Sequence, residues 1–381
     1  MDSNTSKENK DLSQPKQSGR RTPLVVSAGI VLLFAVIVAF GSALNDRRST
    51  TRQSTDDSVR TSQTETLTTS PNTDASTDGQ PTDMPSVPSL RLIRSLNELS
   101  QVWSVATYVR EDGRMMVVGG NAEGDIKVWD GPVGQLERVL IGHTDTVRTV
   151  AVSPSGNRLV SGSGDGIKVW DPRAGKLLYS LPEATDSSVW TVAISPDGRT
   201  FISGDYSGTI TVWDLESGQA LYRRYVDVPV WGIAIAPDGE SFISANDDGT
   251  ITQWNLDTGG VVKEFLGHTN TVRAVAITPD GKTLASSSWD STIKLWNLGT
   301  GELKTTLEEH RDRVVTLAIS PDGKTLASGS VDRTLKTWDI DSQTLIKTLD
   351  TNSDWVLTVA FDPAEQTLIS GGKNQDVKVW Q

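Results

Sequence analysis

The sequence predicts an all-β fold of seven repeated units, preceded by one membrane-spanning helix and a linker. Three observations lead to this prediction. Residues 24–44 carry no charge and are apolar enough for a membrane helix, and a Ser/Thr-rich segment follows them. Beyond residue 90, tryptophan recurs at intervals of 41 to 43 residues. A fixed interval of this size indicates a repeat architecture, and the alternating apolar and polar residues within each interval indicate strands.

The composition excludes several classes of site. The chain has 381 residues, a formal charge of −12, three His and no Cys. Without cysteine it can form no disulfide, thiolate nucleophile, zinc–thiolate site or iron–sulfur cluster. Residues 1–89 carry nine basic and ten acidic side chains, so −11 of the charge belongs to residues 90–381. This acidity argues against a nucleic-acid partner, which would be bound through clustered Lys and Arg.

The chain begins with a polar tail, residues 1–23, and continues into the apolar segment 24–44. About 20 apolar residues span a bilayer as a helix, so we expect an uncleaved signal anchor. Two alternatives stay open. The segment could be a buried core helix, or it could be a cleaved signal peptide, because Gly41 and Ala43 resemble a cleavage site. The apolar part of a signal peptide is usually shorter, about 7–15 residues.

The orientation in the membrane follows from the flanking charges, which are nearly balanced. A short N-terminal tail on the inside is the default, and it would place the repeats on the extracytoplasmic side of a single-pass protein. The basic residues are Lys7, Lys10, Lys16, Arg20 and Arg21 on the N-terminal flank, and Arg47, Arg48, Arg52 and Arg60 on the other.

Residues 45–89 contain 19 Ser or Thr, four Pro and almost no aliphatic side chains. Such a segment cannot bury enough apolar surface to offset the entropy lost on ordering. We expect it to be a disordered linker that tethers the repeats.

Each repeat contains an alternating apolar run, a turn, and two further alternating runs separated by a small polar turn. The turn is Pro-Asp-Gly in four units, which combines the fixed φ of Pro, the local hydrogen bonding of Asp and the conformational freedom of Gly. The turns lie at 196–198, 237–239, 279–281 and 321–323, with a variant at 154–156, and the repeats end at Trp129, Trp170, Trp213, Trp254, Trp296, Trp338 and Trp380.

These units resemble the Trp-Asp (WD) repeat family of β-propellers, over residues 90–381, and are similar to bacterial members of that family. Asp follows the repeat Trp at 130, 171, 214 and 339, and Gly-His occurs at 142–143 and 267–268. The resemblance implies seven blades of four strands around a central channel.

The chain stops after only three strands of the last unit. The segment Leu90–Leu96 (LRLIRSL) parallels the outer strand 176–181 (KLLYSL). We therefore expect residues 90–96 to complete the last blade and close the ring without a covalent bond.

The three histidines share one position within their units. The resemblance implies that each belongs to a structural network of His, turn Asp, Ser and repeat Trp. The implied sets are His143, Asp165, Ser161 and Trp170; His268, Asp290, Ser286 and Trp296; and His310, Asp332, Ser328 and Trp338.

With the histidines assigned to structure, little remains for catalysis. We expect no metal, no cofactor and no enzymatic activity. Residues 246–249 (NDDG) look like part of a calcium loop but lack its spaced ligands and terminal Glu, so they are predicted to be a turn. A glycosidase built on two carboxylates stays open, although no pair stands out.

Five tryptophans lie outside the repeat position. The family places such residues on one face around the channel mouth, where aromatic and arginine side chains are typical of binding hot spots. We predict a partner-binding surface there, and the alternative is simple packing between blades. The set, with the residues that align with these positions or lie beside them, is Trp103, Arg148, Trp190, Tyr206, Trp231, Arg273, Trp289, Arg313 and Trp355.

These expectations describe a membrane-tethered scaffold that binds protein or peptide partners. The acidic charge favours a partner with apolar anchors and some basic character. A sensor that binds a small molecule or peptide at the channel mouth is the alternative.

Overall fold

The chain divides into two units, 1–79 and 80–381, and the structure, a computed structural model, describes only part of the second. It describes residues 90–381 without 98–99, 182–186, 352–353 and 365–366. The predicted tail, membrane helix and linker all lie outside these residues. Within the described part, no helix has the length and apolarity to cross a membrane.

The described residues form seven antiparallel sheets of four strands, which we number as blades 1 to 7 in chain order. Blade 1 contains β2 (Val102–Val109), β3 (Met115–Asn121), β4 (Ile126–Asp130) and β5 (Gln135–Leu140), and blade 2 contains β6 (Val147–Val152), β7 (Leu159–Ser163), β8 (Gly166–Asp171) and β9 (Lys176–Leu181). Blade 3 contains β10 (Val189–Ile194), β11 (Thr200–Asp205), β12 (Thr209–Asp214) and β13 (Ala220–Tyr225), and blade 4 contains β14 (Val230–Ile235), β15 (Ser241–Asn246), β16 (Ile251–Asn255) and β17 (Val261–Phe265). Blade 5 contains β18 (Val272–Ile277), β19 (Thr283–Ser288), β20 (Ile293–Asn297) and β21 (Leu303–Leu307), and blade 6 contains β22 (Val314–Ile319), β23 (Thr325–Ser330), β24 (Thr334–Asp339) and β25 (Thr344–Asp350). Blade 7 contains β26 (Val356–Phe361), β27 (Leu368–Gly372), β28 (Asp376–Trp380) and β1 (Leu92–Asn97).

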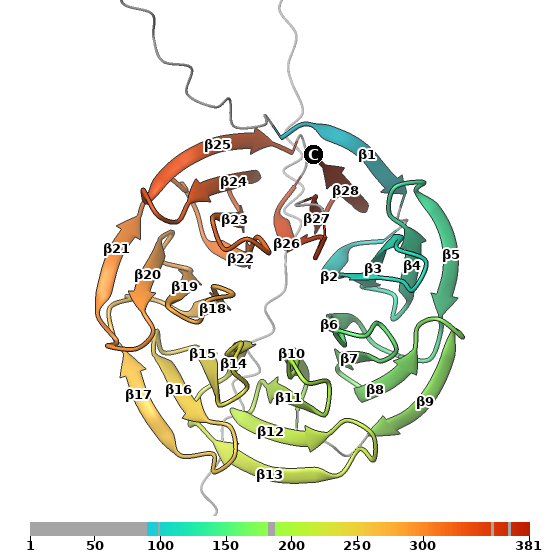
Figure 1. The fold of residues 1–381 in the computed structure, drawn as a ribbon, viewed down its shortest axis with the longest axis horizontal. Helices are drawn as coiled ribbons and strands as arrows, with labels where there is room; N and C mark the ends of the chain where they lie inside the picture. Colours follow the sequence, from blue (N-terminus) through green and yellow to red (C-terminus); the bar gives the residue numbers. More distant parts are fainter. Residues whose placement is uncertain (1–89, 98–99, 182–186, 352–353, 365–366) are drawn as a thin grey trace, which may run out of the picture. The chain divides into compact units, whose positions relative to one another are not determined.

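The seven sheets stand in a ring, with the first strand of each unit innermost (Figure 1). Each inner strand contacts the inner strands on both sides, and β2 contacts β26 to complete the circle. The seven-bladed, all-β prediction is confirmed.

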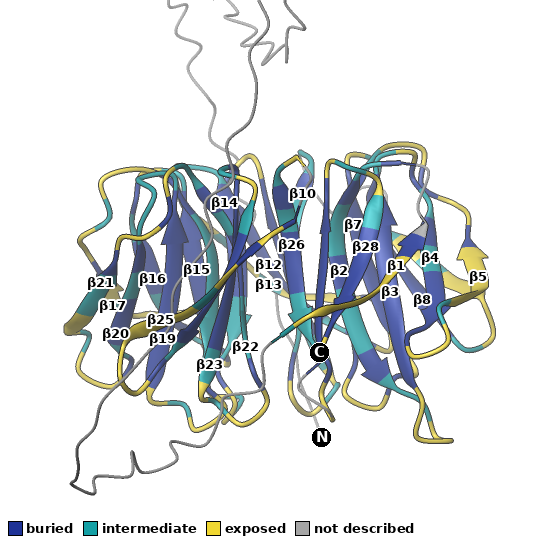
Figure 2. Cartoon of the chain, turned by 90° about the horizontal axis from the view of Figure 1, so that it is seen from above, coloured by how far each residue is buried: buried dark blue, intermediate teal, exposed yellow. Residues whose placement is uncertain are grey.

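The core lies between neighbouring sheets rather than in one central mass. In one of seven apolar clusters, Val160 and Val169 of blade 2 pack with Val189, Phe201 and Trp213 of blade 3. Figure 2 shows the consequence, with the strands inside each blade largely buried and the outer strands, such as β5 and β25, exposed. Strand β7, for example, is buried along its whole length, whereas the outer strand β5 is exposed at every residue except Leu140.

Hydroxyl groups tie most inner strands to their neighbours. Thr191 Oγ1 in β10 accepts the backbone N–H of Ile233 in β14 at 3.1 Å. Ser104, Thr149, Thr316 and Thr358 make the equivalent bond to the next blade. The two remaining inner strands carry Gly232 and Ala274 at this position, which have no hydroxyl.

The ring closes by pairing the two ends of the repeat region. Strand β1 runs antiparallel to β28, from Leu92 opposite Trp380 to Asn97 opposite Asp376. Beyond β1, the Arg91 and Gln381 backbones exchange two hydrogen bonds of 2.8 and 3.0 Å. Leu96 is buried in the cluster between blades 7 and 1. The strand predicted at 90–96 thus corresponds to β1, shifted by one or two residues.

Substitution of Leu96 tests the closure. Leu96 is 2% exposed, whereas Leu92 on the same strand is 47% exposed. Leu96→Ala should lower the free energy of unfolding by about 2–5 kcal/mol, since it leaves a cavity at the seam, and Leu92→Ala should change it by less than about 0.5 kcal/mol. Urea unfolding followed by tryptophan fluorescence measures both. Equal effects of the two substitutions would contradict the closure.

Candidate functional site

A β-bulge occurs at the same place in all seven blades. The second residue of each inner strand has no partner on the adjacent strand, and the register shifts around it. A bulge redirects the extra side chain and bends the strand. Because the inner strands run in parallel directions around the ring, the seven extra residues lie at one end of it, which we term the mouth. They are Trp103, Arg148, Trp190, Trp231, Arg273, Val315 and Leu357, and together they form the mouth ring.

Trp190 lies among mouth-ring residues from several blades. Its ring centroid is 4.5 Å from that of Trp231 in blade 4 and 6.2 Å from that of Trp103 in blade 1, both in edge-on arrangements. Blade 2 lies between blades 1 and 3, so Trp190 and Trp103 meet across its Arg148. The guanidinium carbon of Arg148 is 5.1 Å from the centroid of Trp190.

Loops next to the mouth ring extend this cluster outward. Tyr206 and Trp289 occupy the same position in the turns between the second and third strands of blades 3 and 5. Their centroids each lie 6.0 Å from that of Trp231. Arg313, just before β22, lies 5.5 Å from the centroid of Trp289 and 5.7 Å from that of Trp355. These contacts join eight of the nine predicted partner-binding residues into one cluster. Most of them contact Trp190 or Trp231, and Arg313 and Trp355 are connected to the cluster through Trp289.

The ninth predicted residue, Arg273, lies between two indoles. Its guanidinium carbon is 4.9 Å from the centroid of Trp231 and 5.3 Å from that of Trp190. Its Nη1 donates a 3.0 Å hydrogen bond to the carbonyl oxygen of Trp231. Desolvation by burial lowers the pKa of Arg273 to about 10, so the group remains charged at neutral pH.

The Arg273 bond joins blades 4 and 5 at a seam that lacks a hydroxyl tie. Gly232 stands at the hydroxyl position of β14, and a Cβ added there would lie 3.2 Å from the backbone of Ala274 and of Arg273. A larger side chain at this position would require the two strands to move apart by a few tenths of an ångström. Arg273 supplies the cross-blade hydrogen bond that Gly232 cannot make.

Two residues of the cluster were not predicted from the sequence. Asp247 Oδ1 accepts hydrogen bonds from Trp231 Nε1 at 2.8 Å and from the Thr271 hydroxyl at 3.1 Å. The Lys373 ammonium lies 4.8 Å from the centroid of Trp355. Both occupy the turn position that holds Tyr206 and Trp289 in other blades, and this alignment could have identified them.

The aromatic residues differ in how far they are covered. Trp231 is 8% exposed and is held by Asp247, whereas Tyr206 is 53% exposed. Trp103, Trp190, Trp289 and Trp355 are half-buried. The cluster therefore packs against the blade ends and also presents aromatic surface to solvent.

The three predicted histidine networks are hydrogen-bonded sets in the structure. His268 Nδ1 lies 2.8 Å from Asp290 and its Nε2 lies 2.8 Å from Ser286 Oγ, which accepts the Trp296 N–H at 2.8 Å. The sets around His143 and His310 repeat these contacts, including blade 2, where one residue fewer separates Asp165 and Trp170.

Blades without the histidine keep part of the network. Trp213, Trp254 and Trp380 still donate to a serine hydroxyl of the second strand, at 2.8–3.0 Å. Blade 1 has Gly119 in place of the serine, and a Cβ there would lie 2.9 Å from the ring of Trp129. The indole of Trp129 therefore fills the space that the serine would need.

The network carboxylates have low pKa values. Burial raises the pKa of the Asp165 carboxyl, but hydrogen bonds from His143 and from the Thr144 N–H have the larger effect and lower the pKa to about 2. The pKa values of Asp290 and Asp332 are lowered in the same way. Burial lowers the pKa of His143, which favours the neutral imidazole. These groups are fixed in one protonation state at neutral pH, as expected of structural rather than acid–base groups.

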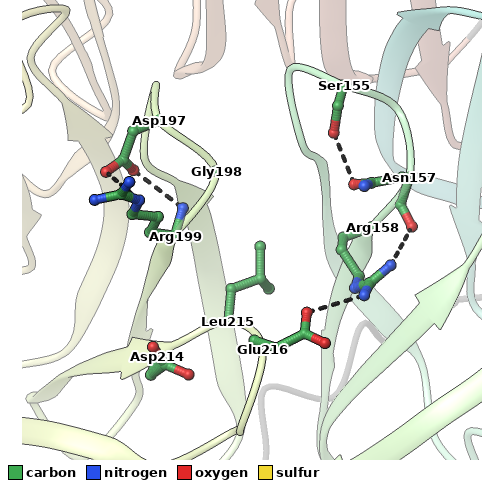
Figure 3. Close-up of a pocket in the computed structure, with 9 residues that line it drawn as sticks. All are labelled: Ser155, Asn157, Arg158, Asp197, Gly198, Arg199, Asp214, Leu215 and Glu216. Atoms are coloured by element: carbon green, nitrogen blue, oxygen red, sulfur yellow. Dashed lines mark hydrogen bonds and ion pairs between the residues drawn. The ribbon is translucent and has the colours of Figure 1, made fainter.

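The opposite end of the inner strands carries the Pro-Asp-Gly turns and a polar cleft between blades 2 and 3. The cleft has a volume of about 370 Å³, and Arg158 and Glu216 form an ion pair of 2.9 Å across it (Figure 3). Hydrogen bonds from Ser195 lower the pKa of Asp197, and those from Ser217 lower the pKa of Asp214. A glycosidase needs one carboxyl whose pKa is raised, so neither of these two fits that role.

Metal binding finds no support in the described ranges. No group of three or more His, Asp or Glu side chains there is arranged to hold a metal ion. Residues 246–249 form a turn between β15 and β16, in which Asp248 accepts hydrogen bonds from Thr250.

Comparison with protein families gives a clear result. The family described as "WD domain, G-beta repeat" matches residues 134–171, 175–214, 223–255, 259–297, 301–339 and 343–381, which together exceed half of the chain. This chain belongs to the WD40 repeat family. Each WD40 match includes residues of the outer strand of one blade and the first three strands of the next blade. Strands β1 to β4 lie outside the matches, although β2 to β5 form a blade with the same strand order.

Curated relatives match only short stretches of this WD40 chain. The small ribosomal subunit protein RACK1 of Caenorhabditis elegans is 33% identical over 26% of this chain and 30% of its own length. Cross-pathway control WD-repeat protein 2 of Flammulina velutipes is 47% identical over 16% of this chain and 19% of its own. Retinoblastoma-binding-like protein E of Dictyostelium discoideum is 37% identical over 18% of this chain and 14% of its own length. The match thus covers less than a third of each of these relatives.

The pH dependence of unfolding tests the network in blade 2. The pKa of Asp165 is about 2 in the folded chain and about 3.9 in an unfolded one. Its contribution to stability is therefore complete above about pH 4 and is lost as the pH falls towards 2. Asp165→Asn should lower the free energy of unfolding at neutral pH by about 1–3 kcal/mol and flatten its acid dependence in that range. Urea unfolding at a series of pH values measures both effects.

The control for this test is Glu240→Gln, a substitution at an exposed turn residue. It should change stability at neutral pH by less than about 0.5 kcal/mol. Parallel pH curves for the wild type and Asp165→Asn would contradict the assignment of Asp165.

Proposed function

We propose that this WD40 propeller is a non-catalytic scaffold that binds a protein or peptide partner on the mouth. The observation that carries the proposal is the bulge repeated in all seven inner strands. It gathers residues that are far apart in the sequence onto one rigid end of the ring. Rigid surfaces bind with a small entropy cost, since little must be ordered on association.

The composition of the mouth supports a protein partner. Trp, Tyr and Arg are the residue types most enriched in interface hot spots. Here they form one connected cluster in which Tyr206 is exposed while Trp231 is held in place by Asp247. An anchored aromatic base with accessible aromatic edges is suited to the apolar side chains of a peptide.

The membrane tether is the second part of the proposal and rests on the sequence alone. The apolar segment 24–44 would act as a signal anchor, and residues 45–89 would act as a flexible linker. The propeller would then search for partners near the membrane, on its extracytoplasmic side. The resemblance to bacterial WD-repeat proteins is part of the same proposal.

A small-molecule sensor is the second candidate. The observation that favours it is the edge-on contact of Trp190 with both Trp103 and Trp231, which places three indole rings together at the mouth. Quenching of tryptophan fluorescence by a small ligand, in the absence of any protein, would support this candidate over the scaffold.

Substitutions at the exposed edge of the mouth test the scaffold. The full chain is used to capture partners from native membranes, with Tyr206→Ala and Trp289→Ala as mouth variants. A captured protein should bind each variant more weakly, by roughly 30-fold if the site is a hot spot of about 2 kcal/mol. The control is Leu221→Ala, because Leu221 is 54% exposed near the start of β13, at the end of the blade opposite the mouth. Capture that is insensitive to both mouth substitutions, or no capture at all, would count against the proposal.

The tether requires its own test. Deletion of residues 24–44 should release the chain from the membrane fraction, because no other segment is expected to anchor it. Cell fractionation followed by detection of the chain measures this. An unchanged membrane fraction would exclude this segment as the anchor.

A further inference from the structure

The centre of the mouth contains more hydrogen-bond donors than acceptors. The guanidinium of Arg273 has five N–H groups, and among the described residues one of them is bonded, to the Trp231 carbonyl. No carboxylate of the described residues lies within ion-pair distance of Arg273. The remaining N–H groups of this half-buried guanidinium are therefore available to a ligand that carries an acceptor.

A second donor in the same cluster is also unsatisfied. The Nε1 of Trp190 is buried and has no hydrogen-bond partner among the described residues. The indole of Trp190 lies between the guanidinium groups of Arg273 and Arg148, at 5.3 and 5.1 Å from its centroid. By contrast, the neighbouring Trp231 N–H is bonded to Asp247. A buried indole N–H normally finds a partner, so the missing one is an acceptor.

The carboxylates near the mouth do not fill this role. Asp247 bonds Trp231 and Thr271, Asp145 lies 3.7 Å from Arg148, and Asp312 lies 3.5 Å from Arg313. Asp145 and Asp312 are about half exposed, so these two pairs are weak. Arg273 at the centre therefore has no carboxylate partner among the described residues, although its guanidinium lies against the Trp231 and Trp190 rings.

We propose that the mouth binds an acidic peptide segment of a partner protein, with a carboxylate of the peptide on the Arg273 guanidinium and an adjacent apolar side chain against the mouth tryptophans. This inference rests on the scaffold function and specifies its ligand. A carboxylate can accept two parallel N–H bonds from one guanidinium. Trp190 Nε1 is buried, so its pairing with the same carboxylate would require the indole to shift.

The net charge of the chain makes this proposal distinctive. The overall charge of −12 repels acidic ligands at long range and favours basic ones. The expectation of a partner with basic character follows from that total. A preference for acidic peptides can arise only from a local site, because non-specific attraction to the negatively charged chain would favour basic peptides.

A peptide array tests the proposal directly. The probes are random peptides of equal length, synthesised in matched pairs that differ only in whether the charged positions hold Glu or Lys. The full chain should bind the Glu member of a pair more strongly, and the bound set should be enriched in Leu and aromatic residues. Arg273→Gln should reduce binding to the Glu peptides about tenfold, the loss expected from one charge-assisted hydrogen bond.

A second variant separates ligand binding from the seam between blades 4 and 5. Arg273→Gln removes the charge, whereas Arg273→Lys keeps it, and both alter the bond to Trp231. If the Lys variant keeps the preference for Glu peptides and the Gln variant loses it, the site binds an anion. Equal loss in both variants, with unfolding temperatures lowered alike, would mean that Arg273 acts only as a tie between blades and would overturn the proposal.

The remaining outcomes are also decisive. Binding that favours Lys peptides, or that ignores charge, would overturn the acidic-peptide proposal and leave the scaffold function intact. An array on which no peptide binds, with the chain folded, would contradict both.

Discussion

The pairing of β1 with β28 is the constraint on which the other features depend. A row of seven sheets would leave one sheet face and one inner strand exposed at each end, and each apolar cluster needs two neighbouring sheets. By placing a strand from the start of the repeat region on the last blade, the chain supplies a partner for every sheet. The inner strands are then held in one circle, and their ends are fixed relative to one another. The mouth exists only because the circle is complete.

Within that circle, a single local irregularity produces the candidate site. The bulge at the second residue of every inner strand adds no side chain to the blade faces, which remain packed with Val, Ile and Leu. Side chains of very different size and charge are therefore tolerated there, from Val315 to Trp190. Packing between blades therefore limits these side chains less than those on the blade faces, although Arg273 also links blades 4 and 5. This tolerance lets one scaffold carry many surfaces.

Much of the fold was predictable because its determinants are local and repeated. The tryptophan interval gave the number of blades, and the similarity of 90–96 to an outer strand indicated where the ring closes. The aligned positions of Trp103, Trp190 and Trp231 indicated that they share one end of the ring. The sequence could not show that Trp190 reaches Trp103 across a blade, or that Gly232 brings two strands so close that Arg273 must link them. Both depend on the curvature of the whole ring, which no single repeat encodes. The total charge alone does not describe the mouth ring, whose two charged residues, Arg148 and Arg273, are both basic.

The position of β1 has a mechanical consequence. Residues 1–89 precede Leu90 in the chain, and the backbone of the next residue, Arg91, is hydrogen-bonded to Gln381. Any tension transmitted through the N-terminal region enters the propeller at the strand that closes it, and at the end of that strand. The strand that closes the ring is thus also the strand that follows the N-terminal region in the chain, and a pull on that region acts first on the pairing of β1 with β28.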